Sequence, residues 1–142
     1  MTDVLTSDHI ASVSLADADK DPQAFANELG RSFVDYGFAV IRDHGIPQDL
    51  IDRAEQKSRE FFALPEEVKK KYFIEGQSGQ RGYTPFGIET AKGLKAHDLK
   101  EFWHVGRDLP AGHKYASSML PNVWPSEVPG FKDTFLELYE AF

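Results

Sequence analysis

The sequence predicts an α/β (α+β) fold in which helices pack on short strands. Apolar residues recur at the helical period in several stretches, and short apolar or alternating runs separate these stretches. The 142 residues include 41% hydrophobic and 27% charged residues, which is ordinary globular composition. We therefore expect a disordered tail at 1–9 and one domain at 10–142.

The composition excludes several classes of protein. With 16 Lys and Arg residues against 23 Asp and Glu, the net charge of −7 predicts no binding to nucleic acid or to an anionic membrane surface. There is no cysteine, so disulfides and thiol nucleophiles are excluded, and the five histidines and the carboxylates are left as metal ligands. No signal peptide and no apolar span of about 18 residues is recognisable, so we expect a cytoplasmic protein.

The first elements have clear local signals. A loose alternation at 10–15 predicts a short strand. Asp21 as N-cap, Pro22 at the first helical position and Gly37 after the end predict a helix between them. Its apolar stripe consists of Phe25, Leu29, Phe33 and Tyr36. The apolar run at 38–41 then predicts a strand that is buried on both faces.

A second helix follows and is broken by Pro65. Its inner stripe consists of Leu50, Ile51, Ala54, Phe61 and Phe62. A short helix at 65–72 comes next, and its lysines at 69–71 are typical of a solvated helix end.

The rest of the chain contains more loop. A glycine-rich loop is expected at 75–97, a strand at 99–105 and a proline-rich connector at 108–130. A last helix has an apolar stripe of Phe131, Phe135, Leu138, Tyr139 and Phe142, and it reaches the final residue without a cap. We therefore expect a truncated chain whose last helix is cut.

Two groups of residues are candidates for chemistry. Arg81 and Tyr83 lie in the glycine-rich loop, where they suit recognition of a carboxylate; alternatively, Tyr83 anchors the loop and Arg81 pairs with an acid. His97 and Asp98, together with His104 and His113, offer the ligand types of a ferrous facial triad. The triad begins His-x-Asp, whereas His97 and Asp98 are adjacent, so a structural role for the pair is favoured. His104 either lines a pocket or is a structural histidine.

Several segments in order resemble one enzyme family. Residues 38–47 (FAVIRDHGIP) resemble the Gly-Phe-x-x-Val-x-x-His-Gly-Ile stretch of the isopenicillin-N-synthase-like 2-oxoglutarate/iron(II) dioxygenases, and residues 61–69 (FFALPEEVK) resemble the family's helix break. Further segments that resemble the family follow in the family's order: RGY at 81–83, DLKEFWHVGRD at 98–108, NVWP at 122–125 and PGF at 129–131.

The resemblance implies the N-terminal region of such an oxygenase. Members bind Fe(II), most of them decarboxylate 2-oxoglutarate to succinate, and they oxidise a C–H bond of a small-molecule substrate. In the family this region packs on a C-terminal double-stranded β-helix (jelly roll), and its short strands join that domain. The β-helix carries the metal triad, and we expect it to be absent from this chain. The residues implied to face substrate are Arg81, Tyr83, Glu101, Trp103 and His104, with His104 opposite to Glu101 and Trp103 on the strand.

Two hypotheses follow. In the first, the chain is the front part of a 2-oxoglutarate/Fe(II) oxygenase, supplies scaffold and a substrate-facing loop, and binds neither cofactor by itself. In the second, it is a stand-alone, non-catalytic interaction module derived from such an oxygenase, with the last helix buried against a partner. Under the first hypothesis the parent protein is a 2-oxoglutarate- and Fe(II)-dependent enzyme, and the sequence does not decide whether this chain alone is one.

Overall fold

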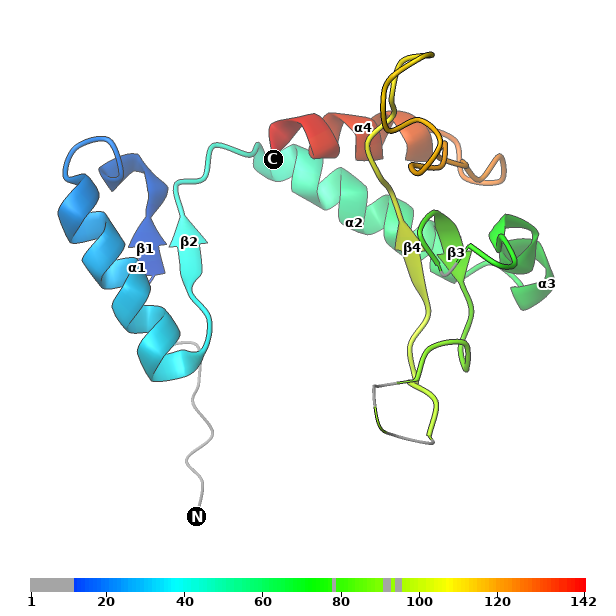
Figure 1. Cartoon of the computed structure of the whole chain (residues 1–142), viewed down its shortest axis with the longest axis horizontal. Helices are drawn as coiled ribbons and strands as arrows, with labels where there is room; N and C mark the ends of the chain where they lie inside the picture. Colours follow the sequence, from blue (N-terminus) through cyan, green and yellow to red (C-terminus); the bar gives the residue numbers. More distant parts are fainter. Residues whose placement is uncertain (1–11, 78, 91–92, 94–95) are drawn as a thin grey trace. The chain divides into compact units, whose positions relative to one another are not determined.

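The computed structural model describes residues 12–77, 79–90, 93 and 96–142. The predicted tail at 1–9 lies outside these residues. The chain divides into two compact units, with the boundary between Gly45 and Ile46 (Figure 1). The single domain at 10–142 therefore stays a prediction, and each unit is described by itself.

In its described residues, the first unit contains two paired strands and one α-helix. β1 (Ser12–Ser14) leads through the 3-10 turn η2 (Leu15–Asp17) into α1 (Pro22–Tyr36), and β2 (Val40–Arg42) follows. The two strands are parallel, with Val13 opposite Ile41. The helix begins and ends where the sequence predicts, because Asp21 accepts a hydrogen bond from the backbone N–H of Ala24 and Gly37 adopts φ 79°.

The prediction of a strand buried on both faces is wrong for β2. Val40 is 43% exposed, and Phe33 on the predicted inner stripe of α1 is 54% exposed. Over residues 12–45, two strands of three residues and one α-helix offer too little surface to cover both faces of the sheet and the whole apolar stripe.

The second unit contains three α-helices and a two-stranded antiparallel sheet among its described residues. α2 (Gln48–Phe62) is followed by α3 (Glu66–Lys69) and the 3-10 turn η3 (Lys70–Tyr72), and α4 (Phe131–Ala141) ends the unit. β3 (Gly82–Thr84) pairs with β4 (Phe102–His104), with Tyr83 opposite Trp103. The sequence pattern missed β3, because a three-residue strand that begins with glycine leaves no alternation to detect.

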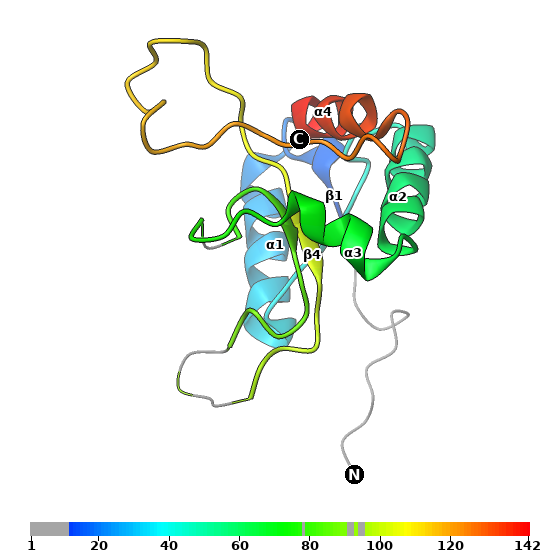
Figure 2. The ribbon, with the colours of Figure 1, turned by 90° about the vertical axis from the view of Figure 1, so that its right-hand side faces the viewer.

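The core of this unit is aromatic. Phe61 is fully buried, and its ring contacts Trp103 edge-to-face with centroids 4.7 Å apart. Phe131 is 2% exposed and packs on the same tryptophan at 5.1 Å. This packing holds α4 along α2 (Figure 1, Figure 2). At the surface, Arg53 and Glu137 join the same two helices by two hydrogen bonds of 3.0 Å.

Among the described residues, no helix combines the length and the apolar composition that crossing a membrane requires.

Candidate functional site

Glu101 is the centre of a buried polar network in the second unit. Its Oε1 and Oε2 lie 3.0 Å and 2.7 Å from Lys69 Nζ, and Oε2 also accepts a hydrogen bond of 2.5 Å from the Tyr83 hydroxyl. Lys69 donates further to the carbonyl of Phe62 at 3.2 Å. The side chains of Lys69 and Glu101 are only 9% and 15% exposed. Both carboxylate oxygens of Glu101 are therefore occupied by partners within the unit.

The network changes the expectation for two residues. Lys69 is buried, so the prediction of a solvated lysine cluster is wrong at this position; its carboxylate partner lies 32 residues further along the chain. Tyr83 is 1% exposed, which agrees with its anchoring the segment. Burial, followed by the hydrogen bond and charge of Glu101, raises the pKa of the Tyr83 hydroxyl well above its ordinary value, so Tyr83 stays protonated.

Arg81 directly precedes β3 and is also buried, with 9% exposed. Its Nη1 donates to the carbonyl of Gln80 at 2.6 Å, and its Nε has no hydrogen-bond partner among the described residues. No acidic side chain among the described residues pairs with Arg81. The acid partner that was the alternative for Arg81 is therefore not found in this part of the chain. The guanidinium lies against the backbone of Gly106. Arg81 and Tyr83 thus belong to a buried hairpin and not to an exposed loop.

An open hollow runs along β4. It has a volume of about 470 Å³, within the size range of small-molecule sites. Its walls come from α2, β4 and α4 and are mostly aromatic, with three polar side chains. The lining residues are Ser58, Phe62, Glu101, Phe102, Trp103, His104, Val105, Phe131 and Phe135.

The resemblance implies five substrate-facing residues. Three of them line this hollow: Glu101, Trp103 and His104. Trp103 is held by the aromatic core, and its indole N–H is buried without a partner among the described residues. His104 is exposed, and its Nδ1 contacts the carbonyl of Gly79. Arg81 and Tyr83 are not among the lining residues. The roles of all five in binding stay predictions.

The described residues do not fit an iron site. No group of three or more His, Asp or Glu side chains lies close enough together in this part of the chain to hold a metal ion. His97 Nδ1 instead lies 3.0 Å from the Thr90 hydroxyl, and Asp98 pairs with Lys100 at 3.4 Å. The structural interpretation of the His97–Asp98 pair agrees with these contacts.

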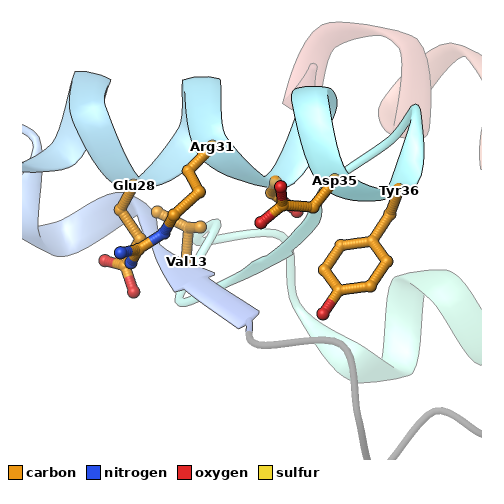
Figure 3. A pocket seen from close by; sticks show the side chains of 6 residues that line it. Val13, Glu28, Arg31, Asp35 and Tyr36 are labelled. Carbon is orange, nitrogen blue, oxygen red and sulfur yellow. The ribbon is translucent and has the colours of Figure 1, made fainter.

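The first unit contains a smaller hollow beside α1. Figure 3 shows Glu28, Arg31, Asp35 and Tyr36 extending from that helix, with Val13 of β1 beneath them. Its volume of about 90 Å³ has room for a few water molecules only. The hollow along β4 is therefore the better candidate for a substrate-sized ligand.

Comparisons with known proteins identify the family. Residues 10–127 match the family described as "non-haem dioxygenase in morphine synthesis N-terminal". The chain belongs to this family, and it matches the N-terminal part of a relative named as a 2-oxoglutarate-dependent dioxygenase.

Curated relatives and solved structures agree with the family. The chain is 32% identical to a 2-oxoglutarate-dependent dioxygenase of a Phoma species over 96% of this chain and 45% of the relative. It is 34% identical to a homoarginine-6-hydroxylase of Arabidopsis thaliana over 75% of this chain and 30% of the relative. A crystal structure from Caulobacter crescentus, assigned to the 2OG-Fe(II) oxygenase family, superimposes with a TM-score of 0.76 and 51% identity over 94% of this chain and 43% of that one.

These comparisons confirm the predicted fold class and the family, and they favour the oxygenase hypothesis over the stand-alone module. The chain spans less than half of the length of the relatives it matches. Phe131, which the second hypothesis placed at a partner surface, is buried in the core of this chain's own second unit.

Proposed function

We propose that this chain supplies one wall of the substrate site of a 2-oxoglutarate/Fe(II) oxygenase that acts on a carboxylate-bearing small molecule. The hollow along β4 carries the proposal, because it collects Glu101, Trp103 and His104 in an aromatic surface of substrate size. Residues outside the described part of the chain would hold Fe(II) and 2-oxoglutarate, in a C-terminal β-helix domain. These cofactors would supply the oxidation itself.

The described residues contribute binding and orientation. Trp103, Phe131 and Phe135 offer a rigid apolar surface to the carbon skeleton of a substrate. His104 is the exposed polar side chain at this surface. Glu101 lines the hollow but is occupied by Lys69 and Tyr83, so its role would be to fix β4 in place. A cytoplasmic location stays a prediction from the sequence.

A carboxylate on the substrate is supported by Arg81, which lies outside the hollow and directly precedes β3, the partner strand of β4, and by one relative. Arg81 is a buried cation without an acid partner among the described residues, and a planar guanidinium matches a carboxylate with two parallel hydrogen bonds. The Arabidopsis relative is named for hydroxylating homoarginine, an amino acid and therefore a carboxylate.

The test is turnover by the complete product of the gene, including any residues that follow Phe142. Purified protein with Fe(II) and 2-oxoglutarate would be assayed for succinate, with a panel of amino acids led by homoarginine and with thymine as a carboxylate-free probe. We expect succinate formation that an amino acid stimulates and thymine does not. Absence of any succinate would contradict the oxygenase, and equal stimulation by thymine would contradict the carboxylate.

Variants connect the activity to the described residues. Arg81→Ala should raise KM for the stimulating amino acid by roughly ten- to a hundredfold, the equivalent of one charged hydrogen bond. His104→Ala should also raise KM, while His97→Ala is the matched control because His97 is exposed and lies outside the hollow. Unchanged kinetics in Arg81→Ala would assign Arg81 a structural role.

A further inference from the structure

Gly106 leaves the space that the side chain of Arg81 occupies. A Cβ atom on residue 106 would lie 2.1 Å from Cζ of Arg81 and 2.2 Å and 2.4 Å from its two terminal nitrogens. No pair of atoms packs this closely, so any other residue at 106 would displace the guanidinium. Gly106 does not adopt a positive φ, so backbone conformation does not explain the glycine. The space that the Arg81 side chain occupies explains the glycine.

Asn122 holds the backbone of Gly106 from the connector that precedes α4. Its Oδ1 accepts a hydrogen bond of 2.8 Å from the N–H of Gly106, and its Nδ2 donates one of 2.7 Å to the carbonyl of the same residue. The remaining amide hydrogen is donated to Asp108 Oδ1 at 2.8 Å. One side chain therefore satisfies both backbone groups of Gly106 and fixes the surface against which the guanidinium lies.

Arg81 itself has no negative partner in the part of the chain that the structure describes. It is 9% exposed, its Nη1 reaches only the carbonyl of the preceding residue, and its Nε is buried without a partner among the described residues. A buried charge that is not paired costs much free energy, so such a group indicates a partner outside the described residues. A carboxylate fits both the charge and the planar geometry of a guanidinium.

We infer that Gly106 and Asn122 are positioning residues, which hold the guanidinium of Arg81 in the orientation that receives a carboxylate. The inference rests on the proposed function, which assigns Arg81 to a carboxylate-bearing substrate. The carboxylate comes either from that small molecule or from an acidic side chain of the protein outside the described residues, and the experiment separates these two sources.

The experiment is NMR of the complete gene product with 15N-labelled arginine. The Nε–Hε signal of Arg81 is assigned by its loss in Arg81→Lys. Acetate is added at constant ionic strength, with chloride as the control anion. We expect the signal to move saturably with acetate and not with chloride. In Gly106→Ala the signal should already be displaced before acetate is added, and the acetate affinity should fall by roughly tenfold or more, as for the loss of one charged hydrogen bond.

Matched controls exist in the chain. Gly30 also has an ordinary φ, and a Cβ there would meet nothing within 4 Å, so Gly30→Ala should leave the Arg81 signal unchanged. Asn122→Ala should displace the signal as Gly106→Ala does. Asn27→Ala, which removes only an exposed contact with Gln23, is its control. Gly106→Ala should fold, because the atoms that a new Cβ would meet belong to the end of a flexible side chain.

The outcomes separate the positioning role from the carboxylate. An Arg81 signal that is unchanged in both Gly106→Ala and Asn122→Ala would overturn the positioning role, whatever acetate does. An Hε signal that is already shifted downfield and does not respond to acetate would identify an acidic side chain of the protein as the partner. An Hε signal at its ordinary position that does not respond to acetate would overturn the carboxylate assignment and leave the positioning result intact.

Discussion

Lys69 and Glu101 form a buried ion pair of 2.7 Å between α3 and the segment that leads into β4, 32 residues apart in the chain. Because Glu101 also lines the hollow, the pair connects α3 to the candidate substrate wall. Breaking the pair is therefore expected to affect both the stability of the second unit and the shape of the hollow.

Lys69→Met should destabilise the protein by about 3–5 kcal/mol, because it leaves the Glu101 carboxylate buried without its cation. Urea unfolding measures this change. The control is Lys70→Met, because Lys70 makes an exposed pair with Glu66, whose loss should change stability little. Equal losses of stability in the two variants would contradict the prediction, because the buried ion pair would then matter no more than the exposed one.

Tyr83 should make the stability of the protein fall above pH 10. The folded-state pKa of its hydroxyl lies above the ordinary value of 10.0, first because of burial and then because of Glu101. Above that ordinary value the unfolded chain loses this proton while the folded protein keeps it, so rising pH favours unfolding. Urea unfolding from neutral pH to above pH 10 should show a smaller decline in Tyr83→Phe. An identical decline in the two proteins would contradict this origin of the pH dependence.

Gly82→Ala should cost about 2–5 kcal/mol, from the positive φ and from steric overlap together. Its φ is 71°, and a Cβ there would lie 2.5 Å from the carbonyl oxygen of Tyr72 and 2.7 Å from Val123. Gly87→Ala separates the two contributions, since Gly87 has φ 77° and open space around it. Thermal unfolding of both variants measures the difference, and a difference of zero would exclude the overlap.

Phe61→Ala should cost about 3–5 kcal/mol, because the fully buried ring contacts five other aromatic rings and leaves a cavity when it is removed. Phe61→Leu should cost less and keeps the measurement possible if the alanine variant does not fold. Phe86→Ala, with its ring 57% exposed, is the control in the same unit. Chemical denaturation measures the loss of stability in each variant, and equal losses in Phe61→Ala and Phe86→Ala would contradict the prediction.

The parts of the fold that could be predicted depend on neighbouring residues. The bounds of α1 follow from Asp21, Pro22 and Gly37, each of which acts within one turn of the chain. The burial of β2 could not be predicted in this way, because a run of apolar residues does not reveal how much structure is available to cover it. The burial of Lys69 could not be predicted either, because its partner Glu101 lies 32 residues further along the chain.

The candidate site was predicted in part. The segment that contains Glu101, Trp103 and His104 was found through the resemblance, and the structure gathers these residues at one hollow. Gly106 and Asn122 lie in segments that resemble the family, but nothing in the sequence distinguishes them from their neighbours. Their relation to Arg81 depends on the close approach of three separate segments, and no spacing in the sequence records that approach.

Among the strands that the structure describes, β4 has β3 as its one hydrogen-bonded neighbour. A strand with one neighbour presents backbone donors and acceptors along its other side, where a second molecule can add a strand. A preparation limited to these 142 residues is therefore expected to self-associate at high concentration, and a lysine in place of Phe102 would be a reasonable first substitution to keep it monomeric.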